Sequence, residues 1–508
     1  MKLTIEKQPI CTGEVSVIAT AEQPIQCDVL LPDYYPDIAR ILCCSVTGIV
    51  TNTQSRGDKL NIDGMAVVDV SYCSESSEMR STQYRVPFSR SVQLKEGYNV
   101  GAVDVQISST TTTCRAISRR RMDITSTLSI IVRVCDTKEV EAVCSADGMG
   151  VQVKNTEGTA AKIAAQLSRP IQLTDQLPLP SEIRPPLTIV CTNCHPIVEE
   201  CKLVGGRVVV KGSLEMTILF QEKGQKKVSR LKHSLPLTSL IEAPAGVTNP
   251  QCDVCLRVIS CEATYQGEYN PDKNEISVSA QLEADVKLYS TYQFKGVNDC
   301  YSTNFECSPT YQLMNLPQMD KVINAPVTTS NKMQIPDGVT EVTDVTLTPS
   351  RETATVEGGK IVASCRMLVT VLGRNAEQGF ECFERQWEVK EALEAPILDG
   401  KLEMLPSFQQ DALEWQIEGD MLILKARFTI RGGPMFYKKV KMMTNVAVDQ
   451  SKPVEQDITV GMMIYYPTIG EQVWDIAKRY NTNAALILQQ NDLDTPIVQS
   501  SQPLIIPT

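Results

Sequence analysis

Histidine and aromatic residues are scarce in this chain. Two histidines occur among 508 residues, and Phe, Trp and Tyr together make up 5%. A hydrolase with a Ser–His or Cys–His pair would have to use His195 or His233 as its base. Neither histidine lies in a recognisable nucleophile motif. We therefore expect a protein that is not an enzyme and that holds no cofactor.

Long apolar runs and a basic excess are also missing. No run approaches the ~18–20 apolar residues that span a bilayer, and residues 2–20 lack the apolar core of a signal peptide. Asp and Glu number 60 against 49 Lys and Arg, a net charge of -11. Because phosphates are bound by basic faces, this balance argues against a nucleic-acid partner and against membrane insertion or anionic lipid. We interpret the one dense basic run, Arg119–Arg121, as a solvated strand edge and expect cytoplasmic residence.

Cysteine, by contrast, is abundant, with 18 residues. Disulfide scaffolds are typically short and secreted, and this chain has neither property. Cys43, Cys135, Cys255 and Cys365 alternate with apolar residues on predicted strands. Free cysteine packs as a small apolar side chain, so we expect reduced core cysteines. Later oxidation within an extracellular shell stays open.

Two Cys-x-x-Cys pairs begin at Cys191 and Cys252 and end at Cys194 and Cys255. Two such pairs could together bind zinc. The pairs lie 252 − 191 = 61 positions apart, which is longer than the spacing in common zinc fingers. Residues i and i+3 of a strand also point to opposite faces, so the two cysteines of a pair on a strand could not bind one ion. The first pair, with His195, also matches a c-type haem attachment pattern, which matures outside the cytoplasm. We therefore expect no bound metal.

Three segments of the chain resemble one another. In each, a glycine turn and a basic residue precede two alternating β-like runs, and Lys59, Arg207 and Lys360 mark equivalent points at offsets of 207 − 59 = 148 and 360 − 207 = 153. Two further markers repeat in the same order. They begin at Leu31, Leu179 and Ile335 and at Arg120, Lys273 and Gly419. A period of about 150 residues is the length of a domain and not of a solenoid unit.

The composition of each copy is typical of strands. Val, Ile and Thr alternate with a period of two between turns rich in Gly, Asn, Asp and Pro, which predicts antiparallel two-sheet domains. One helix is predicted in this part, from Ala161 to its end at Pro170. The predicted domains are 1–150, 151–305 and 306–450, followed by a polar linker, 451–462.

The period changes in the last segment, 463–508. A short strand is predicted to start at Tyr465, and Thr482 is a candidate cap for a second helix. The apolar positions of two helices and a closing strand follow at Val473, Trp474, Ile476, Ala477 and Tyr480, at Leu486–Leu488 and at Leu504–Ile506. The order strand, helix, helix, strand results.

These positions carry two resemblances. The last segment resembles a LysM domain at Gly470, Trp474, Ile476, Ala477, Tyr480, Leu486, Asn491, Leu493, Ile497 and Leu504–Pro507. "LPDYYPDIARIL" from Leu31 and "RRRMDITSTL" from Arg119 resemble the SPOCS domain (DUF3794) of spore-forming Firmicutes. The expected fold class is mainly β, with three tandem SPOCS domains followed by a βααβ LysM domain. This order resembles clostridial spore-coat morphogenetic proteins that bind the stage IV sporulation ATPase.

The resemblance implies a non-enzymatic adaptor in spore envelope and coat assembly. It would lie in the mother-cell cytoplasm at the forespore surface, and later in the spore coat, and would tether coat layers to the scaffold ATPase through its LysM domain. Other coat proteins are further expected partners, and self-association is an open alternative. The main alternative is a structural protein of the spore cortex or cell wall that binds peptidoglycan or another N-acetylglucosamine glycan.

The resemblance also implies where a ligand or partner would bind. LysM domains hold sugar chains between two loops, here Gly470–Val473 and Asn491–Ile497. The expected binding residues are Gly470, Glu471, Gln472, Val473, Trp474, Asn491, Asp492, Leu493 and Ile497. Glu and Gln replace the usual Asp and Thr, which are better helix caps, and Ser501 replaces a usual glycine. These departures favour a protein partner over a glycan, and for Trp474 a plain core role is the alternative.

Overall fold

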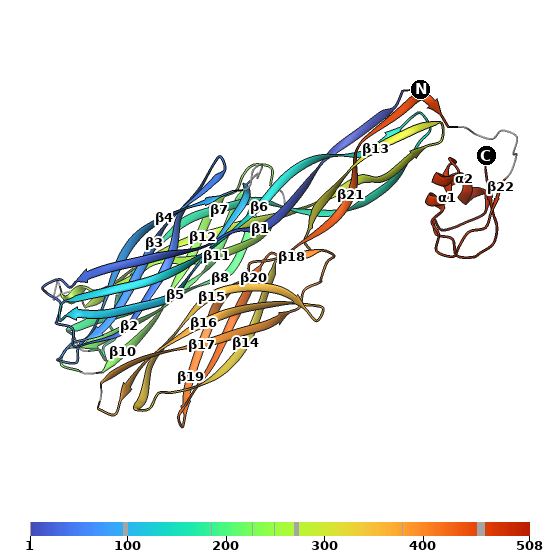
Figure 1. Ribbon diagram of the computed structural model, residues 1–508. Coiled ribbons are helices and arrows are strands. Elements are labelled where there is room, and N and C mark those ends of the chain that lie inside the picture. Colours follow the sequence, from blue (N-terminus) through green and yellow to red (C-terminus); the bar gives the residue numbers. More distant parts are fainter. Residues whose placement is uncertain are drawn as a thin grey trace.

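The computed structural model describes residues 2–94, 100–183, 185–225, 227–247, 249–268, 274–377, 379–454 and 463–507. Three β modules form an elongated body, long strands continue from the body as a narrow stalk, and a small helical head lies at the far end of the stalk (Figure 1). The mainly β fold class predicted from the sequence is confirmed. No helix within the described ranges has the length and apolarity needed to cross a membrane.

The first module pairs two three-stranded antiparallel sheets. In ladder order, the strands of one sheet are β2 (Arg40–Arg56), β3 (Lys59–Cys73) and β4 (Met79–Gln93), and those of the other are β1 (Thr4–Leu30), β6 (Arg121–Asp147) and β5 (Val100–Ser118). Alternate residues of the two inner faces, such as Ile62, Val68, Leu128 and Ile130, are fully buried between the sheets.

The second and third modules repeat this plan. The second contains β8 (Leu187–Val204), β9 (Arg207–Glu222) and β10 (Val228–Glu242), facing β7 (Val151–Pro178), β12 (Glu275–Ser302) and β11 (Gln251–Tyr265), with a 3-10 turn η1 (Gln266–Glu268). The third contains β15 (Val339–Glu357), β16 (Lys360–Asn375) and β17 (Phe380–Leu393), facing β14 (Ile323–Gln334), β20 (Met421–Gly432) and β19 (Ser407–Glu418).

The repeat markers occupy equivalent places. Lys59, Arg207 and Lys360 each open the central strand of one sheet, namely β3, β9 and β16. The other two markers meet in space, because the amides of Leu31, Leu179 and Ile335 donate to the carbonyls of Arg120, Asn274 and Asp420 over 2.9, 3.1 and 2.8 Å. The sequence period thus reflects a repeated arrangement of strands.

The basic run Arg119–Arg121 is only partly the solvated edge that we predicted. Arg119 and Arg121 are exposed and pair with Glu75 and Asp28. The Arg120 guanidinium instead donates to the carboxylate of Asp37 over 2.9 Å and to backbone carbonyls of the 32–35 turn. Its role is to hold the Leu31 segment against the start of β6.

The stalk is built by strands from all three copies. β1, β6, β7 and β12 are 27 or 28 residues long and run from the body into the stalk. A third pair, β13 (Phe305–Gln318) and β21 (Met435–Pro453), completes it, with short β18 (Lys401–Glu403) beside β21. All six long stalk strands give side chains to a common core, and β13 gives two. These are Ile10, Ala142, Ala160, Phe294, Met314, Leu316 and Met442, all at most 6% exposed.

The helix predicted from Ala161 is wrong. These residues belong to β7, which pairs with β12 along its whole length. Ala160 and Ala161 are fully buried in the stalk, and Pro170 is tolerated because β7 lies at the edge of its sheet. Tertiary pairing therefore overrides the helix preference of the alanines.

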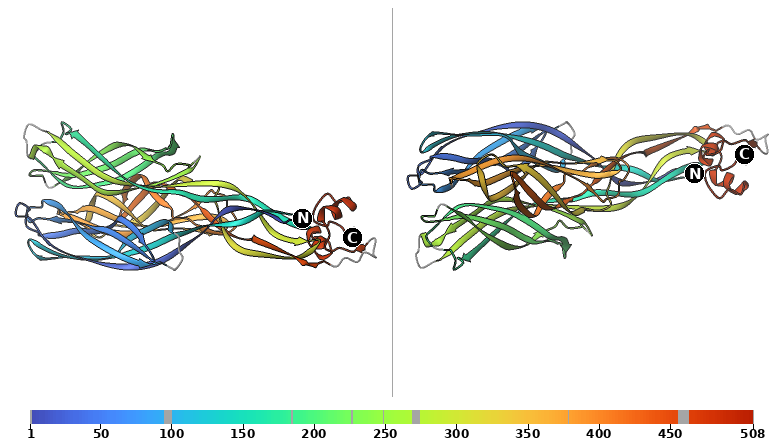
Figure 2. Two further views of the ribbon diagram at one scale, coloured as in Figure 1. Left: turned by 90° about the horizontal axis from the view of Figure 1, so that it is seen from above. Right: turned by 90° about the horizontal axis from the view of Figure 1, so that it is seen from below.

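The modules pack around a shared apolar cluster, in which Met79 of the first module meets Leu219 and Val228 of the second and Leu372 and Phe380 of the third. The views in Figure 2 show the first and second modules on opposite sides, with the third between them. The predicted domain boundaries near residues 150 and 305 fall at the turns between β6 and β7 and between β12 and β13. Since stalk and cluster mix the copies, independent folding of each stays a prediction.

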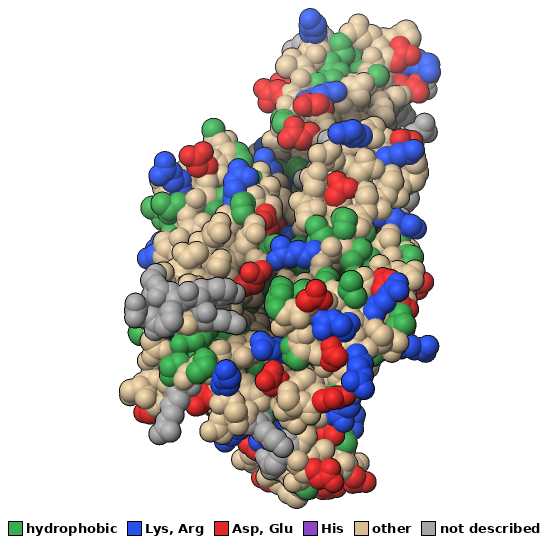
Figure 3. Space-filling view, turned by 90° about the vertical axis from the view of Figure 1, so that its left-hand side faces the viewer, with side chains coloured by type: hydrophobic (Ala, Val, Ile, Leu, Met, Phe, Trp, Pro, Cys, Tyr) green, Lys and Arg blue, Asp and Glu red, His purple; other side chains and the backbone are tan. Residues whose placement is uncertain are grey.

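The far end of the body, opposite the head, carries a mixed surface. Lys and Arg side chains alternate there with Asp and Glu, between small apolar areas (Figure 3). Charges of both signs are interspersed on that face, and such a surface suits a polar protein partner better than a polyanionic partner.

Candidate functional site: the head and its contact with the stalk

The head consists of β22 (Met463–Tyr465), α1 (Val473–Arg479), α2 (Ala484–Gln490) and β23 (Leu504–Ile506), with β22 and β23 paired. Its core includes Val473, Ile476, Ala477, Ile487 and Leu504, all at most 4% exposed. The predicted order strand, helix, helix, strand is therefore confirmed. Of the predicted linker, residues 451–453 continue β21, and 455–462 lie outside the described residues.

Two local predictions in the head are wrong. The first strand ends at Tyr465 and does not begin there. Asn483, not Thr482, caps α2, because its side-chain oxygen accepts a hydrogen bond from the amide of Ala485 over 2.8 Å. Thr482 is buried, and its carbonyl is used elsewhere, as described below.

Glu471 and Gln472 behave as poor helix caps, as their residue types suggest. Gln472 is the N-cap of α1 and makes no capping hydrogen bond with its side chain. The Glu471 carboxylate instead accepts from the hydroxyl of Tyr465 over 2.9 Å and pairs with Arg479 at 3.3 Å. Glu471 thus ties β22 to the end of α1, which is a structural role within the head.

The two loops predicted to bind a ligand lie side by side. The amide of Gly470 donates to the carbonyl of Val498 over 2.8 Å, and that of Val473 donates to Pro496 over 2.9 Å. Gln472 forms a β-bridge with Ile497. Gly470 and Ile497 are exposed, whereas Val473 is buried in the head core. The structure therefore brings Gly470–Gln472 and Ile497 together at one surface.

The remaining predicted residues of the second loop differ in their surroundings. The Asn491 side chain donates to the carbonyls of Ile487 and Ile505, both over 2.8 Å, and accepts from the Ile505 amide over 2.7 Å. It therefore joins α2 to β23. Leu493 packs against the head core, and Asp492 is exposed.

Trp474 contacts the stalk. Its indole nitrogen donates to Oδ2 of Asp299 over 2.8 Å, and its ring lies edge-on against Tyr301, with 5.0 Å between the ring centroids. Both partners belong to β12. The Tyr301 hydroxyl in turn donates to the carbonyl of Thr482 over 2.6 Å. Trp474 is half-buried and helps to fix the head on the stalk, so it is more than a core residue of the head, and its predicted role in binding stays a prediction.

Asp299 is the electrostatic centre of this contact. Lys478 of α1 reaches its carboxylate over 2.7 Å, and the hydroxyl of Tyr311 donates over 2.9 Å. Burial raises the pKa of Asp299, but the hydrogen bonds from Lys478, Trp474 and Tyr311 outweigh that effect and hold the pKa below its ordinary value. Lys154 of β7 adds a hydrogen bond to the side chain of Gln472. Nothing in the sequence pattern pointed to Asp299.

The alternative metal and hydrolase sites gain no support. Among the described residues, no group of three or more His, Cys, Asp or Glu side chains is placed to hold a metal ion. The two Cys-x-x-Cys pairs lie on extended strands, β8 and β11. His233 faces Asp175 at 3.1 Å, and burial lowers the pKa of His195.

Comparisons with family models fit this architecture. The model described as "SipL, SPOCS domain" matches residues 37–115 and 187–266, and the LysM domain model matches residues 468–507. The chain contains SPOCS and LysM domains. The two SPOCS matches cover β2–β5 of the first module and β8–β11 of the second, and the LysM match covers the head from α1 to β23. No curated protein and no solved structure matched the chain.

These domains give the protein a general character. SPOCS and LysM are non-catalytic domain families, and together they indicate a sporulation-related protein with a peptidoglycan-binding type of module. That the third module is also a SPOCS domain stays a prediction. The head is called the LysM domain below.

Proposed function

We propose that this protein is a non-enzymatic adaptor of spore-envelope assembly, which acts in the mother-cell cytoplasm at the forespore surface and later in the coat. Its LysM domain binds the scaffold ATPase of that surface, and the body contacts coat proteins. The proposal rests on the place of the LysM domain, which is fixed at the end of the stalk away from the body (Figure 1). This arrangement suits a link between two layers.

The distribution of exposed apolar side chains supports a binding role for the LysM domain. Among the described residues, 14 large apolar side chains are exposed, and five of them belong to this small domain. They are Ile464, Tyr466, Ile469, Leu486 and Ile497. Exposed apolar side chains that form a contiguous patch mark interaction surfaces, and the two on neighbouring loops, Ile469 and Ile497, are the candidates for such a patch.

Ile469 and Ile497 define the part of this surface that lies on the two loops. Ile469 is 71% exposed and Ile497 is 50% exposed. The hydrogen bond from Gly470 to Val498 joins the segments that carry them. Two exposed β-branched side chains on a rigid, hydrogen-bonded pair of loops offer an apolar anchor for a protein partner.

Co-sedimentation of the full chain with the polymerised scaffold ATPase tests the proposal. Wild type is expected to bind, and Ile469→Asp or Ile497→Asp to bind at least about tenfold more weakly, a change of about 1.4 kcal/mol. The matched control is Ile117→Asp, which alters a side chain that is 60% exposed on the first module. Binding that none of the loop variants weakens would refute this role of the loops.

Glycan binding by the same loops is the second candidate, because the LysM family match favours it. Apolar side chains can pack on the faces of sugar rings as well as on a protein. The same variants are therefore tested on insoluble peptidoglycan. Retention of wild type on peptidoglycan but not on the ATPase, lost in Ile469→Asp, would establish a glycan-binding structural protein instead of the adaptor.

A further inference from the structure

Ten of the 18 cysteines form five neighbouring pairs on strands that contact one another, and the two sulfur atoms of Cys300 and Cys307 make a hydrogen-bonding contact. The pairs are Cys43 with Cys382, Cys44 with Cys114, Cys194 with Cys261, Cys201 with Cys252 and Cys300 with Cys307. In the last pair the two sulfur atoms are 3.8 Å apart. Of the four cysteines predicted to be core residues, Cys135 and Cys365 are buried, whereas Cys43 and Cys255 are half-buried.

Three of the pairs join the two sheets of a module. Cys44 of β2 meets Cys114 of β5 in the first module, and β8 meets β11 through two pairs in the second. In each case the strands are the edges of opposite sheets and contact one another. The corresponding strands of the third module, β15 and β19, contain no cysteine.

The other two pairs connect different parts of the molecule. Cys43 and Cys382 lie 382 − 43 = 339 positions apart and join β2 of the first module to β17 of the third. The neighbouring ion pair of Arg40 with Glu381, at 3.0 Å, fixes the same strands. Cys300 and Cys307 lie on either side of the turn between β12 and β13, close to Asp299 and the LysM contact.

Adjacent cysteines do not compete for the same partner. Cys43 and Cys44 are neighbours on β2, and successive side chains of a strand point to opposite faces. Cys43 lies beside Cys382 of β17, whereas Cys44 lies beside Cys114 of β5. The fold thus separates the two pairs by direction, which makes each pairing specific.

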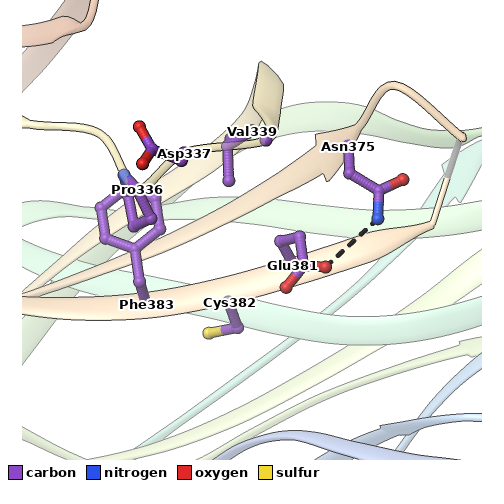
Figure 4. Close-up of a pocket in the computed structure, with 8 residues that line it drawn as sticks. Pro336, Asp337, Val339, Asn375, Glu381, Cys382 and Phe383 are labelled. Carbon is purple, nitrogen blue, oxygen red and sulfur yellow. Dashed lines mark hydrogen bonds between the residues drawn. The ribbon is translucent and has the colours of Figure 1, made fainter.

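Small reagents can reach at least one of the pairs. Cys382 borders a surface hollow with Pro336, Asn375 and Glu381, but its sulfur points to the other side of β17 (Figure 4). A second hollow, beside Asn249, is lined by both Cys201 and Cys252. Most of the paired cysteines are only half-buried, so exchange with a dissolved disulfide does not require global unfolding.

The hydrogen bond within a pair also favours reaction. The thiol of Cys382 stabilises a thiolate at Cys43 and lowers its pKa, and the Cys44 thiol does the same for Cys114. In the same way, the thiols of Cys201 and Cys300 lower the pKa values of their partners Cys252 and Cys307. Since the thiolate is the attacking species in disulfide exchange, a second thiol that stabilises it favours reaction at these pairs.

We propose that the five pairs are sites of intramolecular disulfide formation, so that the chain folds in the reduced form and is locked covalently when it meets an oxidised small-molecule disulfide. At each site one protein thiolate attacks that disulfide, forms a mixed disulfide and releases one small thiol. The partner cysteine then displaces the second small thiol. Two protein thiols lose two electrons and two protons, which the small disulfide gains as it becomes two thiols.

Exposure of the full-length protein to glutathione disulfide tests the proposal. Remaining thiols are blocked with N-ethylmaleimide, and proteolytic peptides are mapped by mass spectrometry. The five named cross-links are expected, with alkylation retained at Cys11, Cys27, Cys73, Cys135, Cys144, Cys191, Cys255 and Cys365. Other pairings, cross-links between chains, or glutathione adducts that never resolve into protein disulfides would overturn it.

Serine variants test the predicted disulfide between Cys43 of the first module and Cys382 of the third. Oxidised wild type, once denatured, should migrate faster than reduced wild type on a non-reducing gel, because a closed loop of more than three hundred residues is compact. Cys43→Ser and Cys382→Ser should each abolish most of that shift, whereas Cys73→Ser, which alters a half-buried unpaired cysteine on β3, should keep it. The circular dichroism of each reduced variant verifies its folding, and an unchanged shift in folded Cys43→Ser would contradict the assignment of this pair.

The cross-links should also change stability. A disulfide restricts the unfolded chain, and the restriction grows with the size of the loop it closes. The Tm of oxidised wild type is therefore expected to exceed that of the reduced protein by roughly 5 °C or more. Equal Tm values after complete formation of the five bonds would show that the pairs cross-link without locking the fold.

Discussion

The indole nitrogen of Trp474 and the carboxylate of Asp299 are 2.8 Å apart, although 175 positions separate them in the chain. This hydrogen bond crosses from the first helix of the LysM domain to the last part of β12. Lys478 and Tyr311 also donate hydrogen bonds to this carboxylate, so the side chain of Asp299 is the centre of the contact between the LysM domain and the stalk. Trp474, an aromatic residue typical of the LysM motif, thus binds another part of the same chain.

Replacement of Asp299 by Ala should loosen the LysM domain from the stalk. The change removes the hydrogen bonds that the carboxylate accepts from Trp474, Lys478, Tyr311 and the amide of Cys300, all of them charge-assisted because the acceptor is ionised. We expect amides of α1 and of residues 299–302 to exchange hydrogen about tenfold faster, which corresponds to about 1.4 kcal/mol. Hydrogen exchange followed by mass spectrometry measures this effect. The control Asp399→Ala, which breaks the exposed pair with Lys438, should leave these amides unchanged.

The sequence predicted those features that depend on local periodicity. The two-residue alternation revealed the strands, and the repeated basic positions Lys59, Arg207 and Lys360 proved to open equivalent central strands. The helices of the LysM domain followed from the spacing of Val473, Ile476 and Ala477. These features could be predicted because each element buries one face, so its apolar period is visible within a short stretch of sequence.

Contacts between distant segments could not be predicted in the same way. The shared stalk arises because strands from three copies continue past their modules, and a strand pattern does not indicate which other strand covers its face. For the same reason Asp299 and the partner of Cys43 left no trace in a single sequence. The alanines after residue 159 favoured a helix, and only the six-stranded stalk explains why small side chains are needed there.

The stalk core should respond strongly to a cavity. Met314 of β13 is 2% exposed between strands of all three copies, while its neighbour Leu313 is 62% exposed. Met314→Ala is expected to lower the free energy of unfolding by about 2–5 kcal/mol. Leu313→Ala, which removes an apolar side chain of similar size from the opposite face of the same strand, should cost less than about 0.5 kcal/mol. Denaturant titration of both variants checks this difference, and equal losses would mean that the stalk is not packed as described.

Arg120 provides a second contrast between neighbours. Its guanidinium bonds Asp37 at 2.9 Å and two backbone carbonyls of the preceding turn, whereas Arg119 makes one exposed ion pair. Arg120→Ala should destabilise the protein by about 1–3 kcal/mol, because partly buried carbonyl acceptors lose their charged partner. Arg119→Ala should change stability by less than about 1 kcal/mol, as surface pairs contribute little. Thermal unfolding distinguishes the two, and a larger loss for Arg119→Ala would contradict the assigned roles.

Glu352 makes stability depend on pH at the contact of the first and third modules. Burial raises the pKa of this carboxyl to about 7, against an ordinary value of 4.5, while a side-chain hydrogen bond from Gln106 of β5 lowers it in part. The folded protein therefore holds a proton that the unfolded chain releases, and the free energy of unfolding should fall as pH rises from about 4.5 to about 7. Glu352→Gln removes this penalty. The variant should match wild type near pH 4 and exceed it by about 1–2 kcal/mol at pH 8. Denaturant titrations across this range, with exposed Glu394→Gln as the control, test the claim, and a variant that is less stable than wild type at pH 8 would show that the ionised carboxylate is favourable there.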